Sequence, residues 1–313
     1  MRFTFVILLF CCLGADAQMI IKAHANYVPF AAGITLPLDI YTDAAAAYSL
    51  RKLRTAYTGN CIRVRRSNDN TELDIGFDAS GVVDTNAIRN FAGDNRADVV
   101  TWYDQSGNAR NMSQSTAANQ PTIKNDTTAG NLIVTRNSKP AIFFELGERL
   151  SATRILSNDD FSIFGAVGLN SVQTNAAILA QHAGTADLGR TIFLGTGDII
   201  GTNNDKARIF FNNGTSRSVS TTNTYTIATP PVLSLFESES DNLGTTTIKL
   251  NGAGTGTISG QTWTPLNTNT TIGALGNGNS AITGAVSEII IYSTKQANAD
   301  GIRTNINLYY GIY

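Results

Sequence analysis

The sequence has little charge, and its charges are balanced. Charged residues make up 15% of the 313 residues, and the formal net charge is -1. Such a chain has no general electrostatic attraction for nucleic acid or for an anionic membrane surface. We therefore expect no nucleic-acid partner. Asparagine, threonine, serine and glycine supply the polar surface instead, which suits β-turns and a carbohydrate partner.

Histidine is scarce, which limits the metal chemistry. His24 and His182 are the two histidines, and neither has a cysteine or an acidic cluster beside it. This spacing does not form a zinc site. No phosphate-binding loop, serine nucleophile elbow or EF-hand is present. We expect no metal and no cofactor, although loops rich in Asp and Asn leave calcium open.

Long apolar runs are absent except at the N-terminus. Arg2 precedes an apolar run from Phe3 to Leu13, and Ala15-Asp16-Ala17 follows as a small-x-small cleavage pattern. This arrangement predicts a signal peptide over residues 1–17 and a mature chain that begins at Gln18, secreted or held at the cell surface. No later segment is apolar enough to be a transmembrane segment.

Cysteine is rare, and Cys11 and Cys12 lie within the predicted signal peptide. Only Cys61 then remains, so the mature chain has no internal disulfide. Arg63 and Arg65 would share its strand face and favour a reactive thiolate. The alternative, which we prefer, is that Cys61 is a small structural residue with no reactive role.

Three segments predict helices. Residues 44–53 are rich in Ala and Leu, with Asp43 as a plausible N-cap. Residues 84–91 form a second short helix, capped by Asp84 and ended by Gly93. Apolar residues at helical spacing over residues 293–313 predict a third helix, ended by Gly311, which closes one edge of the sheet structure.

Short strands separated by turns dominate the rest of the chain. No repeat or linker divides it, so we expect an entry segment over residues 18–36 and a single domain over residues 37–313. Many strands and few helices predict an all-β jelly-roll sandwich of two antiparallel sheets with a few short peripheral helices. The expected strands are 62–66, 73–77, 99–103, 141–144, 161–169, 177–181, 191–194, 208–211, 232–237, 246–250 and 285–292.

The most concentrated polar turn follows two aromatic residues. Carbohydrate sites combine an aromatic face with fixed planar donors and acceptors, so this edge is a candidate ligand-binding site. Alternatively, the polar side chains only bond the backbone of their own turn. The candidate residues are Trp102, Tyr103, Asp104, Gln105 and Asn108.

Two other groups of charged residues are notable. Any two glutamates from three strands could converge as an acid/base pair, or each could be an ordinary polar-face residue. These are Glu145, Glu148, Glu237, Glu239 and Glu288. A basic cluster could contact an anionic glycan, but we expect a solvated face paired with Asp69, Glu72 and Asp74. Its members are Arg51, Lys52, Arg54, Arg63, Arg65 and Arg66.

Five short motifs occur in a recognisable order along the first half of the chain. They are Asp39-Ile40-Tyr41, residues 48–53, residues 62–67, Asp74-Ile75-Gly76 and residues 103–108. This order resembles the N-terminal part of the catalytic domain of α-L-arabinofuranosidase B, over roughly residues 38–122. The second half, at residues 246–252 and 284–292, resembles laminin G or concanavalin A-like sandwiches.

The resemblance implies a concanavalin A-like jelly roll and, in the enzymes, retaining hydrolysis by two carboxyl groups about 5 Å apart. This chain lacks the adjacent cysteines of those enzymes. The turn where they carry the acid corresponds to residues 273–277, which hold no carboxylate. The segment expected to carry the nucleophile, residues 180–213, holds Asp187, Asp198 and Asp205 but no glutamate. No catalytic residue is therefore assigned.

Three functions follow from these observations. The first is a carbohydrate-recognising jelly-roll protein, secreted or at the surface, whose partner is a glycan or polysaccharide. The second is an active α-L-arabinofuranosidase-type glycoside hydrolase with a relocated carboxylate pair. The third is a structural surface or virion component without catalytic activity.

Overall fold

The structure is a computed structural model that describes residues 35–170, 176–182, 192–196, 206–212, 216–226, 230–262 and 267–313. The chain divides into two units, Met1–Thr35 and Leu36–Tyr313, and the second is described below. The predicted signal peptide and His24 lie outside the described residues, as do Asp187, Asp198 and Asp205. No described helix is long and apolar enough to cross a membrane.

The described chain is built mainly of strands. Its α-helices are α2 (Pro37–Ile40), α3 (Thr85–Ala92) and α4 (Ala299–Tyr310), and its 3-10 helices are η1 (Ala117–Asn119) and η2 (Thr127–Ala129). The strands are β1 (Ala44–Ser49), β2 (Ile62–Arg66), β3 (Glu72–Ile75), β4 (Ala97–Trp102), β5 (Met112–Ser113), β6 (Thr122–Lys124), β7 (Thr135–Arg136), β8 (Lys139–Pro140), β9 (Ile142–Phe144), β10 (Leu150–Ala152), β11 (Phe161–Leu169), β12 (Ala177–Gln181), β13 (Ile192–Thr196), β14 (Lys206–Asn212), β15 (Ser216–Thr224), β16 (Leu233–Ser240), β17 (Thr246–Leu250), β18 (Ala253–Ile258), β19 (Thr270–Ile272) and β20 (Gly284–Tyr292).

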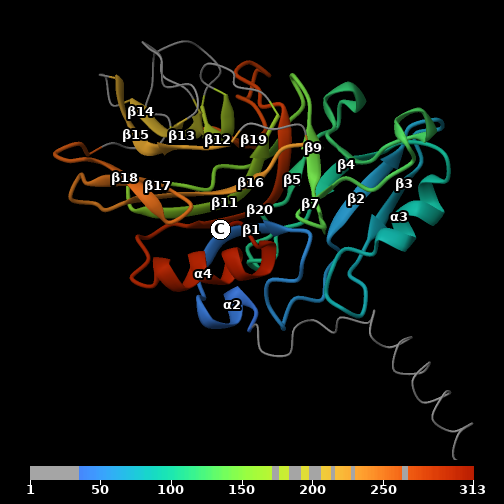
Figure 1. The fold of residues 1–313 in the computed structure, drawn as a ribbon, viewed down its shortest axis with the longest axis horizontal. Helices are drawn as coiled ribbons and strands as arrows, with labels where there is room; N and C mark the ends of the chain where they lie inside the picture. The colour runs from blue at the N-terminus through green and yellow to red at the C-terminus, as the bar shows by residue number, and fades with distance from the viewer. Residues whose placement is uncertain are drawn as a thin grey trace, which may run out of the picture. The chain divides into compact units, whose positions relative to one another are not determined.

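These strands form two facing layers, as expected for the predicted all-β jelly-roll sandwich. One layer runs β1-β20-β11-β16-β17-β18, and the other runs β5-β10-β19-β12-β13-β14-β15. Figure 1 shows the second layer above the first. Strands β4, β6 and β9 link them at one end, and every pairing is antiparallel. The predicted fold class is confirmed.

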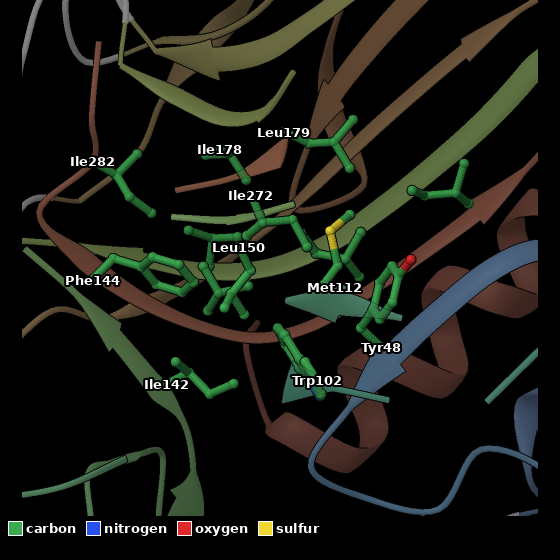
Figure 2. Packing of buried hydrophobic residues seen from close by; sticks show 14 of the residues in the cluster. Tyr48, Trp102, Met112, Ile142, Phe144, Leu150, Ile178, Leu179, Ile272 and Ile282 are labelled. Atoms are coloured by element: carbon green, nitrogen blue, oxygen red, sulfur yellow. The ribbon is translucent and has the colours of Figure 1, made fainter. Parts of the chain in front are cut away.

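The main hydrophobic core fills the space between the layers. Figure 2 shows Trp102, Met112 and Leu150 among the buried side chains of this cluster. Trp102 packs on Tyr48 with ring centroids 5.9 Å apart. Aromatic burial of this kind contributes strongly to the stability of a core.

Strand β20 pairs with three other strands, β11, β9 and β1. One of its edges pairs with β11 along its whole length. The other edge pairs first with β9, where Ala285 faces Phe143, and then with β1, where Ile289 faces Tyr48. The two ends of β20 therefore border different loop clusters.

The predicted helix over residues 44–53 is wrong, because Ala44–Ser49 form strand β1 instead. All six residues are buried, and they pair with β20. Helix propensity is a weak preference that tertiary packing overrides. Small alanine side chains fit here because the main core covers one face of β1 and helix α4 covers the other. Asp43 is consequently not an N-cap, and its φ is 65°.

The two other predicted helices are present. Asp84 accepts hydrogen bonds from the backbone of Asn86 and Ala87 at 3.0 and 2.9 Å and so caps α3. The C-terminal helix was expected to close an edge of the sheet structure. Helix α4 instead lies across the outer face of the β1-β20-β11-β16 layer (Figure 1). Ile302 and Ile306 pack there, because strands in this layer carry apolar residues on both faces.

All eleven predicted strands are found with small shifts in their ends. Besides β1, eight strands were not predicted. Five of them, β5, β6, β7, β8 and β10, have only two or three residues each. The other three, β15, β18 and β19, consist mostly of Ser, Thr and Gly, so they lack the alternation of apolar and polar residues that indicates a strand.

Cys61 lies in the main core with no exposed surface. Its thiol donates to the carbonyl oxygen of Ser49 at 3.4 Å. Burial raises the pKa of this thiol well above its ordinary value. A buried thiol of raised pKa is inert, which supports the structural interpretation over the reactive one.

Candidate functional site

The polar turn at residues 104–108 is organised by one buried carboxylate. Oδ1 of Asp104 accepts hydrogen bonds from the backbone N–H groups of Ala47 and Ser106, each at 2.9 Å. Its Oδ2 accepts from the Ser106 hydroxyl at 2.7 Å and from the Arg110 backbone at 3.0 Å. The Asp104 side chain therefore fixes the turn and anchors it to β1.

Gln105 connects the same turn to the chain that follows β1. Its Oε1 accepts from the Leu53 N–H at 2.8 Å, and its Nε2 donates to the carbonyl oxygens of Ser49 and Arg51 at 2.9 and 3.0 Å. The side chain has no exposed surface. All of these amide contacts are to backbone groups. The Gln105 side chain therefore supplies the hydrogen bonds that a neighbouring strand would otherwise make with this segment.

The two aromatic candidates do not present a face to the turn. Trp102 has no exposed surface and lies in the core (Figure 2). Tyr103 is half-buried, and its hydroxyl donates to Asp74 at 2.6 Å. Burial and this carboxylate raise the pKa of Tyr103 to about 12. Both rings therefore have structural contacts at the end of β4, directly before the turn.

Asn108 differs from these residues because it is exposed and borders a cavity. Its Nδ2 donates to the carbonyl oxygens of Ala44 and Ala45 at 2.9 and 3.2 Å, which ties the turn to the start of β1. Its Oδ1 has no hydrogen-bond partner among the described residues, and it can therefore accept from a ligand. The cavity has a volume of about 610 Å³.

Charged side chains from three parts of the chain line this cavity, which we call the β1 cavity. They are Asp43, Arg54 and Arg110, with Thr42, Ser106, Ser157 and Ser293 between them. Nη1 of Arg54 donates to the Ser106 carbonyl at 2.7 Å. Nη1 of Arg110 donates to the carbonyls of Arg154 and Ile155 at 2.9 and 2.7 Å.

Both guanidinium groups keep further N–H donors without a partner in the described ranges. Neither is ion-paired there, so both offer planar donors to a ligand. A Cβ on Gly107 would lie 2.9 Å from Arg54 Nη1, so the tip of the Arg54 side chain would have to shift. The φ of +98° at Gly107 also favours glycine.

Asp43 supplies a carboxylate acceptor to the same cavity. It is an exposed residue with a φ of 65°, a conformation that non-glycine residues adopt rarely and Asp more readily than most. Its carboxylate accepts from the Thr42 hydroxyl at 3.3 Å. Backbone strain of this kind is concentrated at ligand sites. The β1 cavity thus combines one carboxylate with two guanidinium groups.

The sequence pattern includes Asn108 in this site but misses the charged groups beside it. It predicts Arg54 on a solvated basic face and Asp43 as a helix cap. Arg110 lies two residues after the polar turn 104–108, and this proximity is the one sequence signal that could have placed it at the site. The remaining contributors come from distant segments that a sequence pattern does not bring together.

The glutamate candidates lie elsewhere, and the side chains of four of them have structural partners. Glu288 has no exposed surface and pairs with Arg51 at 2.7 Å. Glu237, 1% exposed, lies 3.1 Å from Lys249 and 3.3 Å from Arg303. Burial raises the pKa of Glu237.

Glu239 and Glu148 are also buried. Glu239 accepts from the Ser162 hydroxyl at 3.0 Å. Glu148 accepts from the backbone N–H of Glu145 at 2.7 Å, and burial raises its pKa to about 7. Glu145 itself is exposed. None of the five candidates lines the β1 cavity.

The turn over residues 273–277 is apolar where the resemblance would require an acid. Leu275 packs against the buried cluster of Ala177 and Ala180. The described residues contain no group of three or more His, Cys, Asp or Glu side chains that could hold a metal ion.

The basic cluster is a solvated paired face only in part. Arg63 pairs with Asp74 at 2.6 Å, and Arg66 pairs with Asp69 at 2.6 Å, as expected. Arg51 is instead completely buried, and Arg65 pairs with the buried Asp98 at 2.6 Å. These two arginines lie inside the fold because they compensate buried carboxylates.

Comparison with known proteins identifies what this chain resembles. Residues 37–147 match the family described as α-L-arabinofuranosidase B, catalytic, which confirms the predicted N-terminal resemblance. A GH54 α-L-arabinofuranosidase soaked with a cyclic sulfate inhibitor has a TM-score of 0.65 and 18% identity, over 86% of this chain and 64% of that chain. An arabinofuranosidase complexed with arabinofuranosyl-α-1,2-xylobiose has a TM-score of 0.62 and 17% identity, over 86% and 64%.

These similarities establish the fold and an arabinofuranosidase-related N-terminal region. The chain spans less than two thirds of the length of these solved arabinofuranosidases. No curated protein sequence matches the chain.

Proposed function

We propose that this protein is a secreted or surface carbohydrate-recognition module that binds neutral sugars in the β1 cavity. One observation carries the proposal: Asp43, Arg54 and Arg110 line one cavity with an exposed carboxylate and with planar donors that have no partner among the described residues. Sugar hydroxyls both donate and accept hydrogen bonds, so they match such a mixed set of groups. The arabinofuranosidase relatives make arabinose-containing glycans the first ligands to test.

Recognition without hydrolysis is the favoured form of the proposal. Retaining hydrolysis needs two carboxyl groups about 5 Å apart, whereas the residues that line the β1 cavity include a single carboxylate, that of Asp43. The apolar packing of Leu275 supports the same conclusion. We also propose a concanavalin A-like classification of the fold, supported by its two antiparallel layers.

The decisive experiment is calorimetric titration of the purified protein with arabinofuranosyl-α-1,2-xylobiose. Asp43→Gly removes the carboxylate but suits the positive φ, so this variant should fold normally. We expect it to bind about 10- to 100-fold more weakly, because a charged hydrogen bond is lost. Arg89→Ala, on the exposed face of α3, is the matched control and should bind like the wild type.

Two results would contradict the proposal. Binding that is unaffected by Asp43→Gly and by Arg110→Ala would exclude the β1 cavity as the site. Turnover of a chromogenic α-L-arabinofuranoside by the wild type would instead favour the hydrolase. Mass spectrometry of the exported protein tests secretion, for which we expect a chain that begins at Gln18.

A further inference from the structure

A second cavity, of about 710 Å³, lies between β6, β7, β9 and the end of β11. We call it the β9 cavity. Its lining includes Thr122, Arg136, Phe143, Glu145 and Asn170, and it shares no residue with the β1 cavity. Nothing in the proposed function uses these side chains.

Two buried polar atoms at this cavity have no hydrogen-bond partner in the part of the chain that the structure describes. They are Nε of Arg136, a donor, and Oδ1 of Asn170, an acceptor. A buried polar group without a partner destabilises the fold. Each of these atoms exposes less than 1 Å², so a hydroxyl-bearing ligand reaches them only when the Arg136 and Asn170 side chains turn toward the cavity. Such a ligand can then satisfy the donor and the acceptor, because each hydroxyl donates and accepts.

The cavity also has an apolar wall of the kind that sugars use. The guanidinium carbon of Arg136 lies 5.8 Å from the centroid of the half-buried Phe143 ring. Leu132, 61% exposed, lines the same cavity. An aromatic ring beside planar polar groups accommodates the C–H face of a sugar together with its hydroxyls.

The charges in the cavity select against an anion. Arg96 and Arg136 are opposed by Asp126 and Glu145, which leaves no net formal charge among these four lining residues. Arg96 is already paired with Asp98 at 2.8 Å. A neutral polyhydroxyl ligand therefore fits better than a phosphate or a carboxylate.

Strand β20 separates the two cavities. Ser293, directly after this strand, lines the β1 cavity, and Phe143, opposite Ala285 near its start, lines the β9 cavity. The strand has nine residues, so its ends are roughly 25 Å apart at about 3.3 Å per residue. A rigid strand holds the two cavities at this separation.

We propose that the β9 cavity is a second site for a neutral sugar residue, so that the protein binds one polysaccharide at two points. The choice of a carbohydrate ligand rests on the proposed function, but the site rests on its own residues. Two sites on one rigid element raise the overall affinity for a polymer above that of either site.

Calorimetric titration with arabinofuranosyl-α-1,2-xylobiose and with polymeric arabinoxylan tests this proposal. We expect two sugars bound per wild-type chain and one per chain of Arg136→Ala/Asn170→Ala, whose β9 cavity should lose about tenfold or more in affinity. The variant should fold, because Asn170 Oδ1 bonds nothing described and Arg136 donates only to the adjacent Thr135 carbonyl. Arg89→Ala should still bind two.

The outcomes separate this proposal from the first. A wild type that binds one sugar, lost in Asp43→Gly and kept in Arg136→Ala/Asn170→Ala, overturns the second site alone. Absence of binding by the wild type overturns both proposals. Arabinoxylan affinity that falls in each variant supports binding at two points.

Discussion

Arg51 and Glu288 form a two-pronged ion pair inside the protein, between the layer that contains β1 and helix α4. Nε of Arg51 lies 2.7 Å from Oε2 of Glu288, and Nη2 lies 2.9 Å from Oε1. Both side chains have no exposed surface. The Ser49 hydroxyl donates to the same carboxylate at 2.8 Å, and the Tyr309 ring centroid lies 4.3 Å from the guanidinium carbon of Arg51.

Removing one partner of this pair should destabilise the protein strongly. We expect Glu288→Ala to lower the free energy of unfolding by about 3–5 kcal/mol, because a buried guanidinium loses its counter-charge. Urea denaturation measures this change. Glu72→Ala is the control, since that carboxylate is 42% exposed and 3.9 Å from Arg63, and it should cost less than about 1 kcal/mol. Arg51→Met/Glu288→Leu should recover much of the loss.

Gln105 should matter for stability more than for ligand binding. Gln105→Ala removes three hydrogen bonds to backbone groups, so we expect a loss of about 3 kcal/mol, at roughly 1 kcal/mol for each bond. Gln296→Ala, whose amide bonds only Thr294, should change stability by less than about 0.5 kcal/mol. A normal stability with lost sugar binding would contradict this assignment and return Gln105 to the ligand site.

Trp102 should tolerate replacement by another aromatic residue. Its side chain is fully buried, and its Nε1 has no hydrogen-bond partner within the described residues. We expect Trp102→Ala to lower the unfolding free energy by about 3–5 kcal/mol, because it leaves a cavity. Trp102→Phe keeps most of the apolar contact and removes the unpaired donor, so it should cost clearly less. Unfolding monitored by circular dichroism measures both changes. An equal loss of unfolding free energy in the two variants would contradict this account of the indole.

Glu148 should make the protein less stable as the pH rises. Burial raises its pKa to about 7 from the ordinary value of 4.5, so the folded state holds a proton that the unfolded state releases. Its contribution is complete below about pH 4.5 and is lost as the pH rises through about 7. Glu148→Gln, which cannot lose a proton, should gain stability relative to the wild type between these values.

The internal control for this prediction is the same comparison at pH 4, where both side chains are neutral. Denaturant unfolding of the two proteins across the pH range gives the difference. A difference that does not change with pH would show that Glu148 is not the responsible group.

Sequence reasoning located most strands because local patterns determine them. The alternation in Ile62–Arg66, the cap at Asp84 and the terminating Gly93 act over a few residues, and a turn-rich chain with short strands has few architectures available. The order of motifs over residues 38–122 carried the arabinofuranosidase resemblance for the same reason, since it is a linear property of the chain.

The tertiary structure decided the rest. Ala44–Ser49 form a strand because β20 and α4 enclose them, which no local propensity shows. Arg51 and Glu288 look like surface charges in sequence, yet they neutralise each other at a separation of 237 residues. The two cavities likewise gather side chains from distant loops, and only the pairing of β20 with β1, β9 and β11 brings them together.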